Sequence, residues 1–205
     1  MNEARLRLGF LASGGGTNLQ AILDACGNGQ LHGDPRIVIS NNSKAGALTR
    51  AHALGIDTGH LSGHTHPDPA QLDEAVCSML QTHDVEVVCL VGYMKKLGPR
   101  TLSVYRRRIL NVHPALLPRH GGQGFYGDRV HAAVLAAGDE VSGVTIHVVD
   151  EEYDHGPVVD QETVPVLPGD TVETLAARVL TLEHALFPRT LQKIAIGQID
   201  LDALG

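Results

Sequence analysis

Strand-like and helix-like hydrophobic patterns alternate along this chain, and this alternation restricts its fold more than any other feature. The apolar run Leu6–Ala12 predicts a strand, and residues 18–25 then carry apolar side chains at helical spacing. The continuous apolar run at residues 85–91 is typical of a strand buried on both faces of a parallel sheet. Further strands are predicted at residues 36–40, 109–113, 143–149 and 158–166, and further helices at 45–54, 69–83, 99–105, 129–137 and 171–186.

Two of these helices begin with capping signals. Asp68 precedes Pro69, which suits a first helical turn, and Asp170 with Glu173 resembles a capping box for the last helix. Because strands that alternate with helices pair through parallel crossovers, we predict one α/β domain over residues 1–205. Its sheet is expected to be mostly parallel and Rossmann-like, to be flanked by helices, and to end in an antiparallel strand pair before a long last helix.

Composition excludes several classes of protein. The chain has 205 residues, of which 43% are hydrophobic and 19% charged, and no apolar run is as long as a membrane span. Its start shows no secretory signal, and Cys26, Cys77 and Cys89 lie far apart in apolar segments. These features predict a cytoplasmic protein with reduced cysteines and no membrane partner. The net charge of −7 argues against a nucleic-acid partner but allows an anionic small molecule, which local dipoles can bind.

Residues 111–118 place an amide and an imidazole two positions apart at the end of a predicted strand. Side chains at positions i and i+2 of a strand point the same way, so Asn111 and His113 are expected to face one spot. Pro114 stops the strand there. Ligands bind at such strand ends in parallel α/β sheets, which predicts a binding site. The alternative is that Asn111 caps a turn and His113 is packed in the core.

A glycine-rich loop joins the first predicted strand to the first helix, and its residues are Ser13, Gly14, Gly15, Gly16, Thr17 and Asn18. Bare glycine N–H groups, a helix N-terminus and three polar side chains make a cradle for a phosphate monoester. The third glycine of a dinucleotide fingerprint is missing, because Leu19 stands there, and so is the Gly-Lys-Ser/Thr of an ATP-type loop. A glycine-rich turn without a ligand is the alternative.

Four carboxylates gather in one predicted loop, at Asp150, Glu151, Glu152 and Asp154. Mutual repulsion would raise the pKa of one of them if it were partly buried. Asp154 precedes a turn at residues 155–157, and a carboxylate held by a turn can orient an imidazole. The alternative is a solvated acidic loop, which is common for a run of charges.

Taken in order, five segments resemble motifs of the folate-dependent formyltransferases, and most closely of the phosphoribosylglycinamide formyltransferases. They are the glycine-rich loop 13–18, Gly92-Tyr93-Met94-Lys95-Lys96-Leu97, Asn111-Val112-His113-Pro114-Ala115-Leu116-Leu117-Pro118, the pattern Gly-x-Thr-x-His…Asp-x-Gly-Pro within residues 143–159, and Glu183-His184. The resemblance covers nearly the whole chain. A glycine-rich loop at residues 121–127 departs from the shorter loop of some members.

The resemblance implies transfer of the formyl group of 10-formyltetrahydrofolate to the amine of phosphoribosylglycinamide in purine (IMP) biosynthesis. It implies that Asn111, His113 and Asp154 are catalytic. It assigns the ribonucleotide and its phosphate to residues 13–18 and Glu183, and the folate to Met94, Lys95, Lys96, Leu97, Asn111, Asp150 and Asp154. Residues of about 1–100 would then form a phosphate-binding half, and residues of about 101–205 a catalytic and folate-binding half.

Acyl transfer of this kind builds negative charge on the formyl oxygen, which donors aimed at that oxygen stabilise. The resemblance implies that Asn111 supplies an amide N–H to it. His113 would be kept protonated because Asp154 raises its pKa, so that it offers a charged donor and then a proton for N10.

No metal is expected. The spacing of His60, His64 and His66 could hold zinc, but their loop is polar and lacks a second ligand cluster. The expected partners are the two small-molecule substrates, and the chain is expected to be a monomer or a homodimer. Two other functions fit part of the pattern: a formyltetrahydrofolate hydrolase, which gives the formyl group to water, and a non-catalytic nucleotide-binding module. The module would leave Asn111 and His113 unexplained.

Overall fold

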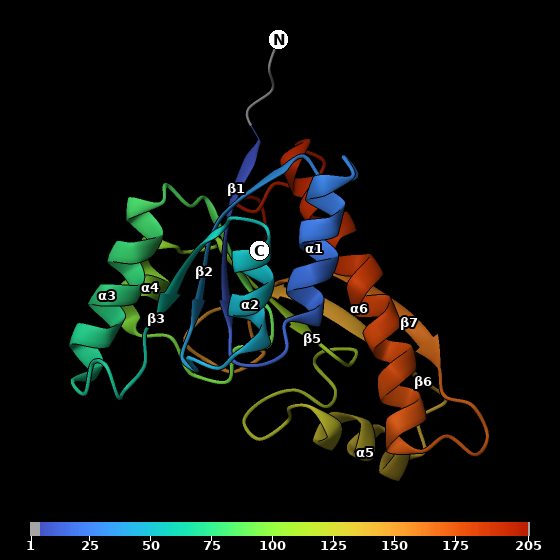
Figure 1. Ribbon diagram of the computed structural model, residues 1–205. Helices are drawn as coiled ribbons and strands as arrows, with labels where there is room; N and C mark the ends of the chain where they lie inside the picture. Colours follow the sequence, from blue (N-terminus) through green and yellow to red (C-terminus); the bar gives the residue numbers. More distant parts are fainter. Residues whose placement is uncertain (1–4, 205) are drawn as a thin grey trace.

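A seven-stranded sheet with the order β3-β2-β1-β4-β5-β6-β7 forms the centre of the molecule (Figure 1). The structure is a computed structural model and describes residues 5–204. Its strands are β1 (Leu6–Ala12), β2 (Gly33–Ser40), β3 (Asp57–His60), β4 (Val87–Leu90), β5 (Ile109–His113), β6 (Val141–Val148) and β7 (Val158–Pro165). The first five pair in parallel, whereas β6 is antiparallel to both β5 and β7. The predicted fold class is therefore confirmed.

Helices cover both faces of this sheet and enclose two apolar cores (Figure 1). On one face lie α1 (Thr17–Gly27), α2 (Gly46–Ala53) and α6 (Val172–Ala195), and α5 (Asp128–Ala137) adds Val134 to the same core. On the other face lie α3 (Pro69–Thr82) and α4 (Pro99–Val104). None of the helices within residues 5–204 is long and apolar enough to cross a membrane.

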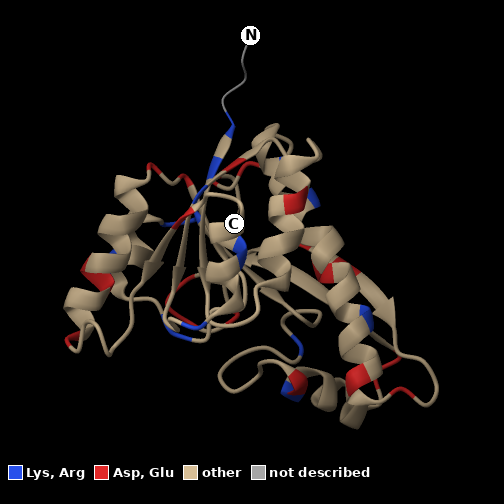
Figure 2. Ribbon diagram, in the orientation of Figure 1, with Lys and Arg blue, Asp and Glu red and all other residues tan. Residues whose placement is uncertain are grey.

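Strand β4 forms within the apolar run 85–91, which was predicted to be a strand buried on both faces of the sheet. Val87 and Cys89 belong to the core under α1 and α6, and Val88 and Leu90 belong to the core under α3. Alternate side chains of one strand thus bury apolar area on both faces, and each fully buried aliphatic side chain contributes about 1.5–3 kcal/mol. Charged residues gather instead on helices and loops, and the middle of the sheet carries few (Figure 2).

One strand was not predicted. Strand β3 has the sequence Asp-Thr-Gly-His and lies at the edge of the sheet beside β2. Only Gly59 in it is buried, so it has no apolar alternation to reveal it. A Cβ at Gly59 would lie 2.3 Å from Met79 Sδ, which explains why a glycine suits this position.

The last helix also differs from its prediction at both ends. Its N-cap is Thr171, whose hydroxyl accepts a bond from the Thr174 N–H, and the Thr174 hydroxyl accepts one from the Thr171 N–H. The predicted capping box of Asp170 and Glu173 is wrong, because Asp170 instead pairs with Arg178 at 2.7 Å.

The predicted end of this helix near residue 186 is wrong as well, since α6 continues to Ala195 through Pro188. Proline inside a helix removes one hydrogen bond. Burial of Leu186, Phe187 and Leu191 on the same stretch offsets that loss.

The parallel strands determine where polar side chains can meet. Strands β1, β4 and β5 are neighbours, so the segments that follow them lie at the same edge of the sheet. The glycine-rich loop follows β1, the segment 91–98 follows β4, and Pro114 follows β5. This edge is the position at which α/β sheets bind ligands.

Candidate active site

Asn111, His113 and Asp154 line one cavity of about 560 Å³ at the carboxyl end of β5. Asn111 and His113 come from β5, and Asp154 comes from the loop between β6 and β7. His113 Nδ1 lies 3.5 Å from Asp154 Oδ2. The amide, imidazole and carboxylate that the sequence predicted to share one site are therefore neighbours in space.

His147 on β6 completes this group. It stands opposite Asn111 in the antiparallel ladder, and its side chain is 2% exposed. Its Nδ1 lies 3.0 Å from the Val148 carbonyl, which can only accept, so Nδ1 carries the hydrogen of a neutral ring. Nε2 then accepts from Asn111 Nδ2 at 3.1 Å. One of the two amide hydrogens of Asn111 remains for another acceptor.

Burial dominates the protonation of His113. The side chain is 4% exposed, and this burial lowers the pKa of His113 below the ordinary histidine value, although Asp154 opposes the shift. Asp154 acts in the predicted direction, but burial outweighs it, so the prediction that His113 is kept protonated is wrong. Nε2 donates to the His120 carbonyl at 2.9 Å, because that oxygen can only accept.

Asp154 is ionised and held in place. Burial acts to raise its pKa, but the nearby imidazoles of His147 and His113 and the Gly122 N–H together bring the pKa below the ordinary aspartate value. Gly122 N–H donates to Oδ2 at 3.0 Å. The backbone of Asp154 has φ of 56°, a left-handed conformation that aspartate tolerates better than most residues. The prediction that repulsion within the acidic loop raises a pKa is wrong for Asp154.

The glycine-rich loop lies against the wall of this cavity rather than in it. Ser13 N–H donates to the Gly92 carbonyl at 3.0 Å, and Ser13 Oγ accepts from Met94 N–H at 2.8 Å. Gly14, Gly15 and Thr17 are exposed, so their main-chain groups can be reached by a ligand.

Asn18, the last residue of that loop, bonds to Glu183 of α6. Asn18 Nδ2 donates to Glu183 Oε2 at 2.5 Å, and Asn18 Oδ1 is buried with no partner within residues 5–204. Burial raises the pKa of Glu183 above the ordinary glutamate value, while the bond from Asn18 acts the other way. A buried carboxyl whose neutral form is favoured more than in an exposed glutamate thus stands beside the glycine-rich loop.

A second, smaller cavity of about 90 Å³ adjoins the first and contains most of the residues predicted to hold folate. Both cavities share Asn111 and Asp154. The residues of the smaller cavity that were predicted are Lys95, Lys96, Leu97, Asn111, Asp150 and Asp154. Met94 lines the larger cavity instead and is 59% exposed.

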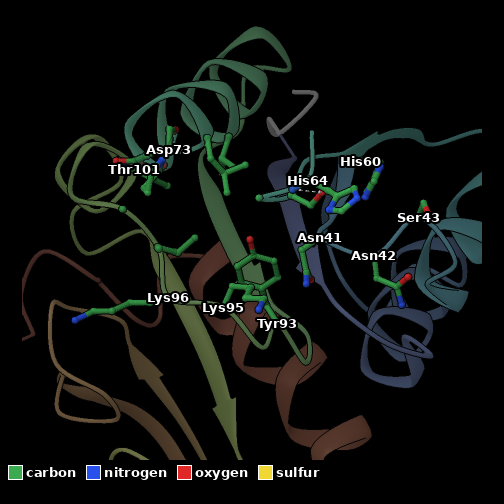
Figure 3. Close-up of a pocket in the computed structure, with 17 residues that line it drawn as sticks. Asn41, Asn42, Ser43, His60, His64, Asp73, Tyr93, Lys95, Lys96 and Thr101 are labelled. Carbon is green, nitrogen blue, oxygen red and sulfur yellow. Dashed lines mark hydrogen bonds between the residues drawn. The ribbon is translucent and has the colours of Figure 1, made fainter. Parts of the chain in front are cut away.

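A third cavity, of about 800 Å³, lies on the other side of the segment 93–97 (Figure 3). Tyr93 and Lys95 line all three cavities, so this segment is the partition between them. The Lys96 side chain extends away from the third cavity, and its Nζ lies 5.6 Å from the Tyr153 ring centroid (Figure 3). Asn41 and Asn42 face this cavity across from Tyr93 (Figure 3).

Comparison with known proteins places the chain in a family. The family model described as formyl transferase matches residues 6–191. This chain belongs to the formyl transferase family.

Two curated relatives and one solved structure carry more specific names. The phosphoribosylglycinamide formyltransferase of Escherichia coli (strain K12) is 38% identical over 93% of this chain and 88% of its own length. The chloroplastic phosphoribosylglycinamide formyltransferase of Vigna unguiculata is 40% identical over 95% of this chain, which spans only 62% of that relative. The glycinamide ribonucleotide transformylase 1 structure from Symbiobacterium toebii has a TM-score of 0.88 at 40% identity and covers 95% of this chain and 89% of its own.

The family motifs did not reveal the residues that hold the His120 carbonyl, which accepts from His113 Nε2. His120 has φ of 54°, and its ring bonds to Asp139 Oδ2 at 2.6 Å, so its carbonyl is fixed toward His113. Arg119 binds the other oxygen of Asp139, also at 2.6 Å. No sequence pattern links residue 120 to residue 139. His147, by contrast, lies within the motif Gly-x-Thr-x-His. Because it is two residues from Thr145 on an alternating strand, the sequence indicated that both side chains lie on one face of that strand.

The three histidines considered for zinc are not gathered. His60 and His64 line the third cavity, and His66 Nδ1 bonds to the Thr65 hydroxyl at 3.0 Å. Within residues 5–204, no three His, Cys, Asp or Glu side chains are grouped as metal ligands.

Proposed function

We propose that this formyl transferase moves the formyl group of 10-formyltetrahydrofolate to the amine of phosphoribosylglycinamide, a step of purine biosynthesis. One observation carries the proposal: an amide, a buried imidazole and an ionised carboxylate share a cavity whose wall is bonded to an exposed glycine-rich loop. The similarity to known proteins supports it, since the relatives from Escherichia coli and Vigna unguiculata are phosphoribosylglycinamide formyltransferases.

The proposed roles of Asn111 and His113 follow from their hydrogens. The second Nδ2 hydrogen of Asn111 is available to an oxygen that becomes negative, because the first is directed to His147. His113 Nε2–H supplies another donor, which the formyl oxygen would share with the His120 carbonyl. Each donor of this kind is worth about 10²–10³ in turnover.

Asp154 is proposed to support His113 through charge. Because burial keeps His113 neutral before reaction, a proton that reaches the ring creates an imidazolium 3.5 Å from a carboxylate. The attraction stabilises that cation during transfer, and the ring can then release the proton to the departing N10. The net movement of one proton is from the attacking amine to N10.

The glycine-rich loop and Glu183 are proposed to hold the ribonucleotide. The phosphate would accept from the main-chain N–H groups of residues 14–17 and from the Thr17 hydroxyl at the start of α1. The Ser13 hydroxyl donates to Asn41 Oδ1 in this structure, so Ser13 would hold the loop in place beside the phosphate. Asn18 Oδ1, which has no partner in the described chain, faces the same region as Glu183 and can accept from the substrate amine. Glu183 can take a proton from that amine and pass it to water, and His113 can take the proton that it gives to N10 from water, so that one proton in total moves from the amine to N10.

The folate donor is proposed to occupy the two smaller cavities. Leu97 and Val149 supply apolar walls, and Asn111, Asp150 and Asp154 supply polar groups, a mixture that suits a flat heteroaromatic ring. Because the 90 Å³ cavity is smaller than a typical ligand site, Lys96, which lines it, would move when the ring enters. Lys95 and Lys96 would attract the carboxylates of the folate tail.

The two halves of the chain are proposed to have different roles. Residues of about 1–100 would supply the phosphate site, and residues of about 101–205 would supply catalysis and most of the folate site. The partners are then two small molecules, and the chain acts as a monomer or a homodimer.

One assay tests the proposal against its alternatives. The protein is mixed with a 10-formyl folate analogue, with and without phosphoribosylglycinamide, and release of the deformylated folate is followed by absorbance. Release that requires the ribonucleotide is expected. Release to water at the same rate without it would instead indicate a hydrolase, and no release in either mixture would indicate a binding module.

A further inference from the structure

The glycine-rich loop rests directly on the first turns of α2. Ala47 N–H donates to the Gly14 carbonyl at 3.2 Å, and Arg50 Nε donates to the Gly15 carbonyl at 2.8 Å. Gly16 has φ of 74°, and a Cβ there would lie 2.8 Å from Ala47 Cα and Cβ. The loop and the helix can therefore approach this closely only because residue 16 is a glycine.

These two bonds determine which way the loop presents its donors. The carbonyl of one residue and the N–H of the next belong to one planar peptide and point in opposite directions. Because the Gly14 and Gly15 carbonyls are directed toward α2, the N–H groups of Gly15 and Gly16 are directed away from it. Within the described part of the chain, neither N–H group donates to a main-chain carbonyl, and the Gly15 N–H, on an exposed residue, can be reached by an anion.

Arg50 makes a second bond that ties the loop to α1. Its Nη1 donates to Gln20 Oε1 at 3.1 Å, and Gln20 N–H donates to the Gly16 carbonyl at 2.9 Å. The planar guanidinium thus bridges the loop and the first turn of α1 with two donors in a fixed arrangement. A lysine ammonium at this position has the charge but cannot reproduce that fork.

We propose that Arg50 is a positioning residue for the phosphate of the ribonucleotide, acting through the Gly15 carbonyl to keep the N–H groups of Gly15 and Gly16 turned toward the ligand. The inference rests on the proposed function, in which this loop holds that phosphate. Inorganic phosphate provides a test that does not depend on catalysis.

The test compares Arg50→Met and Arg50→Lys with a matched control, Arg36→Met. Arg36 is also half-buried and also donates from Nε to a main-chain carbonyl, that of His83, at 3.1 Å, but it lies nearer the amino end of β2, away from the loop. Steady-state kinetics give kcat and the KM of each substrate. Isothermal titration gives the Kd of inorganic phosphate, and circular dichroism checks the fold.

For Arg50→Met we expect the KM of phosphoribosylglycinamide and the Kd of inorganic phosphate to rise about tenfold, which corresponds to about 1.4 kcal/mol. The KM of the folate donor and kcat should stay within about twofold, because Arg50 touches neither the cavity nor its catalytic groups. Arg50→Lys should recover only part of the loss, and Arg36→Met should match the unmodified protein.

Several results would overturn the inference. They are an unchanged phosphate Kd in Arg50→Met, equal rises in the KM of both substrates, an equal effect of Arg36→Met, and full recovery in Arg50→Lys, which would mean that charge alone matters. If the unmodified protein binds inorganic phosphate but shows no ribonucleotide-dependent transfer, the proposed function fails and the phosphate titration still decides the role of Arg50. If Arg50→Met does not fold, the Arg50→Lys comparison decides it.

Discussion

Replacing Asp154 by asparagine removes one charge from the centre of the proposed site while keeping its shape. Asparagine can still accept from the Gly122 N–H through its carbonyl oxygen, and it tolerates the φ of 56° at this position. The variant should therefore fold normally. What it loses is the attraction between a carboxylate and the imidazolium that His113 becomes during transfer.

The size of this loss can be worked out from the geometry. His113 Nδ1 and Asp154 Oδ2 are 3.5 Å apart, and their side chains are 4% and 12% exposed, so water screens them little. Two full charges at that distance, with an effective dielectric constant of about 20, attract each other by about 5 kcal/mol. If the transition state carries half to three quarters of the imidazolium charge, the loss is about 2.5–4 kcal/mol, or about 10²–10³ in kcat.

The assay is steady-state transfer to phosphoribosylglycinamide as a function of pH, with Glu140→Gln as the control. Glu140 is an exposed carboxylate that lines none of the three cavities, and its variant should keep kcat within about twofold. Because Asp154 acts to raise the pKa of His113, and the ring starts the reaction neutral, its removal should also move the loss of activity at falling pH toward lower pH. Normal kcat in Asp154→Asn, or an unshifted pH profile, would refute this reasoning.

Three further predictions concern the polar side chains of the site and the buried histidines. Asn111→Ala and His113→Gln should each lower kcat by about 10²–10³ with little change in Tm, and near-normal turnover in either purified variant would remove that residue from the mechanism. Burial raises the pKa of Glu183, so its protonated form contributes stability below the ordinary value of 4.5 that is lost as pH rises through the raised value. Glu183→Gln should therefore raise Tm relative to the unmodified protein at about pH 8 but not at about pH 4, and an equal difference at both would contradict the burial argument. Burial lowers the pKa values of His113, His131 and His184, so the stability they contribute is present above 6.5 and lost as pH falls through their lowered values. Urea midpoints should fall from about pH 7 to about pH 5, and constant midpoints would show that these rings are not buried in solution.

The sequence was most informative where local chemistry alone determines structure. Strand β5 was predicted with its observed limits, because an apolar run ends at a proline that cannot continue a strand. The start of α3 was predicted for a similar reason, since Asp68 accepts from the Ala70 N–H ahead of a proline-led turn. Strand β3 was missed because an edge strand need not bury alternate side chains.

The candidate site was predictable as a set of residues but not as an electrostatic arrangement. The i, i+2 relation on β5 placed Asn111 and His113 on one face of a strand. The contact of Asn111 with His147, however, depends on the register between β5 and β6, which no local pattern gives. The pKa of His113 depends on the depth of its burial, which outweighs the nearby Asp154.

The most direct test of the account is a crystal structure with phosphoribosylglycinamide and a folate analogue whose carbonyl occupies the formyl position but cannot be transferred. The account predicts the phosphate on the N–H groups of Gly15 and Gly16, and the analogue carbonyl at about 3 Å from Asn111 Nδ2 and His113 Nε2. A phosphate bound elsewhere, or a carbonyl directed away from both side chains, would contradict it.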